Sequence, residues 1–343
     1  MDSKDILFRR EGRLGHITLN RPKALNALTR HMCTAMLAQL RLWKDDPEIR
    51  AVVIDAVPGR AFCAGGDIRA ISQMGKRRDG SAAEFFADEY RLNAAVKHFG
   101  KPYIALIGGI AFGGGVGISI HGSQRVASEN ALFAMPETAI GLFPDVGGTY
   151  ALPRLPGEIG MYLALTGARL GPADMRYTKI ATHYVPNAKF GEIVQRLSNG
   201  EDAEMILLGI AAEPGPPPLA SHREGVDRVF AQGSVEAILN ALEDEGEWGK
   251  QTAASLATRS PTSLKITFRA MREGRSMDFD SCMRMEYRIT MRALEGHDFY
   301  EGVRAALIDK DQRPIWQPES LAVIDDNEIA RYFAGQDVTE LSL

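Results

Sequence analysis

Two short apolar runs that alternate along the chain with segments of helical periodicity constrain its fold more than any other feature. Residues 51–56 end before a Pro-Gly pair, and residues 103–107 lead into a cluster of glycines. In residues 29–44 the apolar side chains from Met32 to Trp43 recur every three or four positions, and Thr29 can cap this helix. Buried strands that alternate with helices predict an α/β fold with a largely parallel sheet.

A proline-rich stretch divides the chain. Residues 213–218 (Glu-Pro-Gly-Pro-Pro-Pro) cannot form the interior of a helix or strand and are typical of a stiff connector. Helical patterns follow it, at residues 235–243, 251–258, 263–272, 279–294 and 299–309. We therefore expect an α/β core over residues 1–212, a connector over 213–222 and a helical C-terminal portion over 223–343.

Composition excludes several classes of protein. The 40 basic and 44 acidic side chains give a net charge of −4, which disfavours a nucleic-acid binder. Residues 1–10 carry charges and lack the apolar core of a signal peptide, and glycines interrupt the most apolar stretch, residues 103–120. The three cysteines are too scattered for a disulfide framework. We expect a cytoplasmic protein that has no membrane segment.

Two glycine-rich segments can present backbone N–H groups to a ligand. Residues 113–117 (Gly-Gly-Gly-Val-Gly) follow a strand, but they complete neither a Walker A loop nor G-x-G-x-x-G. An oxyanion hole and close helix packing are therefore the two interpretations left for this cluster. Gly65-Gly66 can supply another N–H, and the Asp67 that follows can act there or simply cap a helix.

Two carboxylates lie eight residues apart in an otherwise apolar segment, residues 134–148. Burial there would raise the pKa of Glu137 or Asp145 and fit either of them for acid, base or nucleophilic chemistry. The alternatives are a solvated turn residue for Glu137 and a helix cap, near Gly147, for Asp145.

Glu89 lies on the apolar stripe of a predicted helix over residues 82–99. Phe85, Glu89, Leu92, Val96 and Phe99 follow one another at steps of four and three, so Glu89 faces inward. Either its stem is buried while its carboxylate reaches water, or it is a third carboxylate in a pocket. The seven histidines form no pair at metal-ligand spacing, and Gly-x-Ser-x-Gly is absent, so we expect no metal site and no serine triad.

Four motifs, in this order and spacing, resemble the crotonase (enoyl-CoA hydratase/isomerase) superfamily over most of the chain. They are residues 20–28 (Asn-Arg-Pro-Lys-Ala-Leu-Asn-Ala-Leu), 61–69 (Ala-Phe-Cys-Ala-Gly-Gly-Asp-Ile-Arg), 112–117 and 133–141, with Gly147-Gly148-Thr149 after them. The resemblance implies a spiral of ββα turns that makes two nearly perpendicular sheets, followed by trailing helices.

The same resemblance implies an acyl-CoA substrate. Its thioester oxygen would bind two backbone N–H groups, which by position are those of Gly66 and Gly114. CoA would contact a further set of residues: Lys23, Ala24, Leu25, Ala64, Gly66 and Arg69. Of these, Lys23 and Arg69 would meet the phosphates.

Within the superfamily, one position is informative. Hydratases have two catalytic glutamates, one of them just after the triple glycine. Here that position is Gly117, whereas the other glutamate is present as Glu137. Residues 133–148, the tail over residues 296–312, Glu89 and Asp145 are similar to the subfamily that hydrolyses 3-hydroxyisobutyryl-CoA in valine breakdown.

This subfamily resemblance implies roles for the three carboxylates. Glu137 would attack the thioester carbonyl to form an anhydride, or activate water; both remain open. Asp145 would orient or protonate, and Glu89 would bind the substrate hydroxyl. The reaction needs no metal or redox cofactor, and homo-oligomers based on trimers are common in the superfamily. An enoyl-CoA hydratase or isomerase is the nearest alternative, and an RNA-binding crotonase-like protein is an alternative of another class.

Overall fold

The computed structural model describes residues 4–336 and 338–343 and divides the chain into two compact units. The first unit comprises residues 4–67, 91–134 and 169–218, and the second the described parts of 68–90, 135–168 and 219–343. The strands are β1 (Ile6–Glu11), β2 (Leu14–Leu19), β3 (Ala51–Ala56), β4 (Ala61–Cys63), β5 (Tyr103–Ile107), β6 (Ile110–Phe112), β7 (Gln124–Ala127), β8 (Leu132–Ala134) and β9 (His183–Tyr184).

The α-helices belong to both units, and one unit boundary falls inside α3. Their bounds are α1 (Arg30–Asp45), α2 (Ile68–Arg77), α3 (Ser81–Lys97), α4 (Gly114–Ile120), α5 (Gly148–Ala151), α6 (Ile159–Thr166), α7 (Pro172–Tyr177), α8 (Phe190–Ser198), α9 (Ala203–Ile210), α10 (Arg223–Phe230), α11 (Val235–Leu242), α12 (Gly246–Ala257), α13 (Pro261–Gly274), α14 (Phe279–Glu295), α15 (Asp298–Val303) and α16 (Asp326–Phe333).

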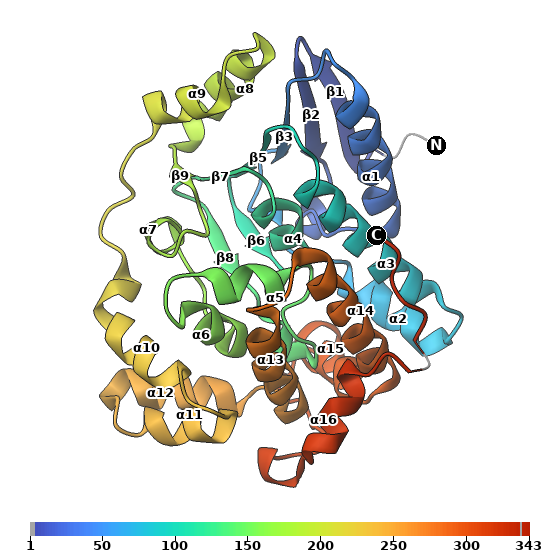
Figure 1. The fold of residues 1–343 in the computed structure, drawn as a ribbon, viewed down its shortest axis with the longest axis vertical. Coiled ribbons are helices and arrows are strands. Elements are labelled where there is room, and N and C mark those ends of the chain that lie inside the picture. The colour runs from blue at the N-terminus through green and yellow to red at the C-terminus, as the bar shows by residue number, and fades with distance from the viewer. Residues whose placement is uncertain (1–3, 337) are drawn as a thin grey trace. The chain divides into compact units, whose positions relative to one another are not determined.

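The first unit contains two sheets, together with several of the helices. The larger has the order β1-β2-β3-β5-β7-β9, running from blue to yellow-green in Figure 1, and only its β1–β2 pair is antiparallel. The smaller sheet, β4-β6-β8, is parallel throughout. Strands β3 and β5 have the bounds that their apolar runs predict, because the central strands of a parallel sheet are covered on both faces.

The chain alternates between these two sheets. Strand β3 is followed by β4 and the helices α2 and α3, β5 is followed by β6 and α4, and β7 is followed by β8. This repeat is the ββα spiral that the sequence motifs predict. Helices α8 and α9 bury Ile193 and Ile206 in the same hydrophobic core as Val53 and Ile104 of the larger sheet. Helix α1 begins as predicted, with the Thr29 hydroxyl accepting a hydrogen bond from the N–H of Met32 at 3.2 Å.

Helices dominate the second unit. Its core joins Phe143 to Ile266 of α13, Ile289 of α14 and Ile329 of α16. The helices α11, α13 and α14 cover the predicted ranges 235–243, 263–272 and 279–294 with small differences at their ends.

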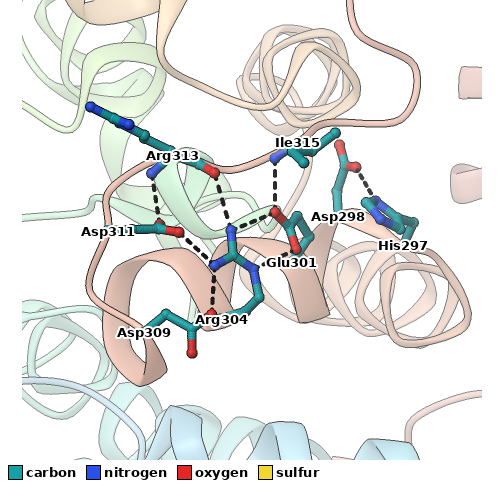
Figure 2. A network of polar contacts seen from close by, with 8 residues as sticks. All are labelled: His297, Asp298, Glu301, Arg304, Asp309, Asp311, Arg313 and Ile315. Atoms are coloured by element: carbon teal, nitrogen blue, oxygen red, sulfur yellow. Dashed lines mark hydrogen bonds and ion pairs between the residues drawn. The ribbon is translucent and has the colours of Figure 1, made fainter.

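The last predicted helix, over residues 299–309, is present, but its second half is π-helical. Helix α15 ends at Val303, and residues Arg304–Ile308 form a wider, π-type turn. There the guanidinium of Arg304 forms ion pairs with three carboxylates, which ties the following loop back to α15 (Figure 2). The partners are Glu301 at 2.9 Å, Asp309 at 2.7 Å and Asp311 at 2.7 Å.

The two units contain different segments of the chain from the domains expected from sequence. A boundary between Pro218 and Leu219 does fall within the expected connector, residues 213–222. Residues 68–90 and 135–168, however, belong with the C-terminal helices rather than with the sheets, because side chains such as Phe143 bury themselves among those helices. A division read along the chain cannot separate interleaved segments of this kind.

Candidate active site

The two glycine-rich segments meet in the first unit. Gly66 forms a parallel bridge with Leu28, in which the carbonyl of Gly65 and the N–H of Asp67 make the hydrogen bonds and the N–H of Gly66 takes no part. A Cβ added at Gly65 would lie 3.6 Å from the nitrogen of Gly114, which shows how closely the two segments approach.

Both predicted N–H donors are available within this unit. Gly114 is the first residue of α4, so its N–H has no partner inside the helix. Among the described residues of the unit, no acceptor is bonded to the N–H of Gly66 or of Gly114. The alternative of close helix packing applies to Gly115 instead, since a Cβ there would lie 2.1 Å from the carbonyl oxygen of Cys63.

Five of the six residues predicted to contact CoA also lie in the first unit. Lys23 and Ala24 belong to a single helical turn (Pro22–Ala24), and Leu25 follows in the left-handed conformation with φ = 52°. The carbonyl of Leu25 accepts a hydrogen bond from the N–H of Ala64 at 3.0 Å, which joins this turn to the segment of Gly66. Arg69 belongs to the second unit, where it donates a hydrogen bond to the carbonyl of Leu307.

Glu137 is a buried carboxylate in the second unit. It begins a short 3₁₀ turn (η2, Glu137–Ile140), and its side chain is only 6% exposed, which excludes a solvated turn residue. Within the described part of the chain, its Oε2 is buried without a hydrogen-bond partner. A buried acceptor of this kind is costly unless a ligand or water satisfies it.

The turn that carries Glu137 is held by close backbone contacts with α15. A Cβ at Gly141 would lie 2.2 Å from the carbonyl carbon of Asp298, and a Cβ at Gly302 would lie 2.5 Å from Ile140. Gly141 also has φ = 72°, a conformation that glycine adopts without strain. The tail over residues 296–312, singled out by its sequence, thus fixes the main chain beside Glu137.

Asp145 is a buried carboxylate and not a helix cap. Helix α5 is preceded by Gly147, whereas the Asp145 Oδ2 accepts a hydrogen bond from the Tyr90 hydroxyl at 2.6 Å. The oxygen of Tyr90 lies 2.8 Å from the hydroxyl of Thr290; since the single proton of Tyr90 goes to Asp145, Thr290 donates to Tyr90. Burial raises the pKa of Asp145 to about 6, although the Tyr90 hydrogen bond lowers it.

Glu89 points inward from α3, as its place on the apolar stripe predicts. It is 2% exposed, so its carboxylate does not reach water, and its Oε1 has no hydrogen-bond partner among the described residues. Burial, and next the charge of Asp145, raise the pKa of Glu89 well above its ordinary value. Burial and the charges of Asp145 and Glu89 do the same to the pKa of Glu137.

The second unit therefore holds three carboxylates that share one electrostatic environment. No Lys or Arg among the described residues forms an ion pair with Glu89, Glu137 or Asp145. Neighbouring acids whose pKa values are raised by burial and by one another can divide the tasks of acid and base between them. Across the described residues, no group of three His, Cys, Asp or Glu side chains has the geometry of a metal site.

Sequence reasoning missed two further side chains of this cluster, Tyr90 and Glu286. Tyr90 has no exposed surface and lies next to Glu89 in α3. Glu286 is also fully buried, on the face of α14 that carries Phe279, Met283 and Ile289. The signal that identified Glu89, an acid on an apolar stripe, would have identified Glu286 as well.

Comparison with known proteins places the chain in a family. The sequence profile described as "Enoyl-CoA hydratase/isomerase" matches residues 14–333. The chain belongs to this family. Its members act on acyl-CoA substrates, in agreement with the expected substrate class. In the described part of the chain, no helix is both long and apolar enough to cross a membrane.

The chain is similar over nearly its whole length to curated family members. It is 49% identical to "3-hydroxyisobutyryl-CoA hydrolase, mitochondrial" of Xenopus tropicalis, over 99% of this chain and 91% of that protein. It is 43% identical to the human protein of the same name, over the same shares of the two chains. The expectation of a cytoplasmic location is wrong by this comparison, because the names of these relatives point to the mitochondrion.

Solved structures confirm the fold. A carnitinyl-CoA dehydratase from Mycobacterium thermoresistibile superposes with a TM-score of 0.94 at 39% identity, over 99% of both chains. An enoyl-CoA hydratase from Rhodobacter sphaeroides gives a TM-score of 0.91 at 39% identity, over 99% of this chain and all of the other. The expected crotonase fold is therefore correct.

Proposed function

We propose that this chain hydrolyses the thioester of 3-hydroxyisobutyryl-CoA, with water as the second substrate and free CoA and 3-hydroxyisobutyrate as products. The near-full-length identity of 43–49% to proteins named for this activity carries the proposal. The buried carboxylates of the second unit supply the acid, base or nucleophile that such a reaction needs.

The first step makes a tetrahedral intermediate at the thioester carbonyl. The N–H groups of Gly66 and Gly114 are our candidates to stabilise its oxyanion, since both lack acceptors within their unit. Either the carboxylate of Glu137 attacks the carbonyl carbon, or Glu137 takes a proton from an attacking water. In the first case the CoA thiolate departs and an acyl anhydride of Glu137 remains. Water then cleaves this anhydride, which releases the acid and regenerates Glu137.

Asp145 and Glu89 take supporting roles in this proposal. With a pKa of about 6, Asp145 can accept and return a proton near neutral pH, for example as the thiolate leaves. Glu89 presents a buried, unsatisfied oxygen, which fits an acceptor for the 3-hydroxyl of the substrate.

The remaining contacts concern CoA. Lys23 is exposed and can meet a phosphate, while the backbone of Ala64 and Gly66 and the side chains of Lys23, Ala24 and Leu25 are our candidates to contact the adenine. By the resemblance, Arg69 is our candidate for a second cation at the phosphates. Thioester hydrolysis consumes only water, so we infer that no metal or redox cofactor takes part, and we infer a homo-oligomer on the pattern of the superfamily.

An enoyl-CoA hydratase is the second candidate, because the two solved structures of high similarity bear the titles of a dehydratase and a hydratase. Addition of water through two glutamates would need the second glutamate where this chain has Gly117. A glycine has no group that can transfer a proton, so this chemistry would be severely impaired.

The test is a comparison of two substrates with one purified protein. Release of free thiol from 3-hydroxyisobutyryl-CoA and loss of enoyl absorbance from crotonyl-CoA are followed side by side, with Glu137→Gln as the inactive control. We expect rapid thiol release from the first substrate and little hydration of the second. Rapid loss of enoyl absorbance without any thiol release would show that the chain is a hydratase.

A further inference from the structure

The buried carboxylate of Glu286, on helix α14, binds the turn after Asp145 through hydrogen bonds. Both of its oxygens accept hydrogen bonds from this turn. Oε2 lies 2.8 Å from the nitrogen of Gly147, and Oε1 lies 3.0 Å from the nitrogen and 2.6 Å from the hydroxyl of Thr149. A fully buried acid is costly, and these three donors offset only part of that cost, because burial still raises the pKa of Glu286 to about 8 while the hydrogen bonds from Thr149 and Gly147 lower it.

The backbone of the turn is one that needs such support. Val146 has φ = 50° and Gly147 has φ = 82°, so two consecutive residues adopt the left-handed conformation. A β-branched residue is strained there, and a strained backbone persists only where its surroundings hold it in place. The hydrogen bonds to Glu286 come from Gly147 itself and from Thr149 just beyond it, so they hold the strained turn at its C-terminal end.

The same helix supports Asp145 from its carboxylate side. Thr290 lies four residues after Glu286 and therefore on the same face of α14. Its hydroxyl donates to the hydroxyl of Tyr90 at 2.8 Å, and Tyr90 donates to Asp145 at 2.6 Å. Helix α14 thus fixes both the main chain next to Asp145 and the direction of its side chain.

We propose that Glu286 is a positioning residue: by binding residues 147–149, it holds the carboxylate of Asp145 where the hydrolytic reaction requires it. The inference rests on the proposed function, because that function gives Asp145 its role. Glu286 acts through the turn and makes no contact with the substrate.

The test replaces Glu286 by glutamine. Glu286→Gln keeps the size of the side chain but replaces one acceptor oxygen with an NH₂ group. This group would face an N–H of the turn, so that two donors meet and one hydrogen bond is lost. We expect kcat for CoA release to fall about 10- to 100-fold with KM changed less than about threefold, as for a misplaced catalytic group. Hydrogen–deuterium exchange should become faster in the peptide over residues 145–151.

The matched control is Ile329→Ala, a cavity in the core of the same unit. Ile329 lies on α16, away from the hydrogen bonds of the turn, and shares a hydrophobic core with Ile289 of α14. The control should lose stability but keep kcat per folded molecule and the slow exchange of residues 145–151. Where Glu286→Gln does not fold, Thr149→Val removes one donor of the three, and we expect a smaller fall in kcat of about 2- to 10-fold.

The outcomes separate this inference from the proposed function. A fall in kcat together with faster exchange, in Glu286→Gln and not in Ile329→Ala, supports the positioning role. Unchanged kcat per folded molecule overturns it, and so does a fall in kcat without faster exchange. If the wild type releases no CoA, the proposed function fails; the exchange data then decide by themselves whether Glu286 holds the turn.

Discussion

Replacing Asp145 by asparagine should make the protein more stable at neutral pH while removing most of its activity. The substitution keeps an oxygen that can accept the hydrogen bond from Tyr90, replaces the other oxygen with an NH₂ group and removes the ability to ionise. A residue that merely capped a helix would behave in the opposite way, because its loss would lower stability and leave the activity of folded molecules intact.

The size of the effect follows from the pKa of Asp145. Burial raises this pKa from 3.8 to about 6, and one pKa unit corresponds to about 1.4 kcal/mol, so the ionised carboxylate costs the native state about 3 kcal/mol. Between these two pH values the native protein keeps a proton that the unfolded chain has lost. The free energy of unfolding therefore falls as pH rises through this window.

The assay is urea denaturation of wild type and Asp145→Asn from pH 4 to pH 8. We expect similar stability near pH 4 and a difference that grows in favour of the variant to about 3 kcal/mol at pH 7. Removing the charge of Asp145 also relieves the neighbouring Glu89 and Glu137, whose pKa values it raises, and this acts in the same direction.

Asp278→Asn is the control, because it removes a carboxylate whose pKa is lowered in the native state instead of raised. Asp278 caps α14, and hydrogen bonds from Ser281 hold its pKa below the ordinary value, so its replacement should not become more favourable as pH rises. If the stability difference for Asp145→Asn is flat with pH, or if the variant is the less stable protein at pH 7, the carboxylate is not buried in the way described and the reasoning fails.

Three further predictions concern catalysis. Glu137→Gln should leave the fold intact and lower kcat about 10²- to 10⁴-fold in the thiol-release assay; near-normal turnover would remove Glu137 from the reaction. Gly114→Pro deletes one N–H and should lower kcat far more than it weakens substrate binding; a folded variant, checked by circular dichroism, that still turns over would place the oxyanion hole elsewhere. Wild type should prefer 3-hydroxyisobutyryl-CoA to isobutyryl-CoA, and Glu89→Gln should reduce this preference by about 1–3 kcal/mol in kcat/KM; an equal loss with both substrates would exclude a bond to the 3-hydroxyl.

Local patterns in the sequence predicted the elements that depend on local rules. The strands β3 and β5 and the start of α1 at Thr29 were found because burial on both faces and side-chain capping leave direct marks on a sequence. The change from α15 to a π-helical segment at Arg304 was not predicted, since the apolar pattern of the sequence does not distinguish the two kinds of turn.

The candidate site was predictable residue by residue but not as an assembly. The apolar stripe of α3 showed that Glu89 faces inward, and the apolar segment 134–148 marked Glu137 and Asp145. Nothing in these patterns shows that Tyr90 donates to Asp145, 55 residues away, or that Glu286 meets Gly147, because such pairs arise only when distant segments pack together.

The hydrogen bond between Glu286 and Gly147 joins residues 139 positions apart, and this has a consequence for the protein's synthesis. A ribosome that adds about 5–20 residues per second needs roughly 7–28 s to extend the chain from one partner to the other. During that time the nascent turn beside Asp145 has no α14 to hold it, and Glu137 has no α15 beside it. Assembly of the acid cluster around Glu286 is therefore a late event in translation, and a chain terminated before residue 279 lacks the hydrogen bonds of Glu286 and Thr290 that support Asp145.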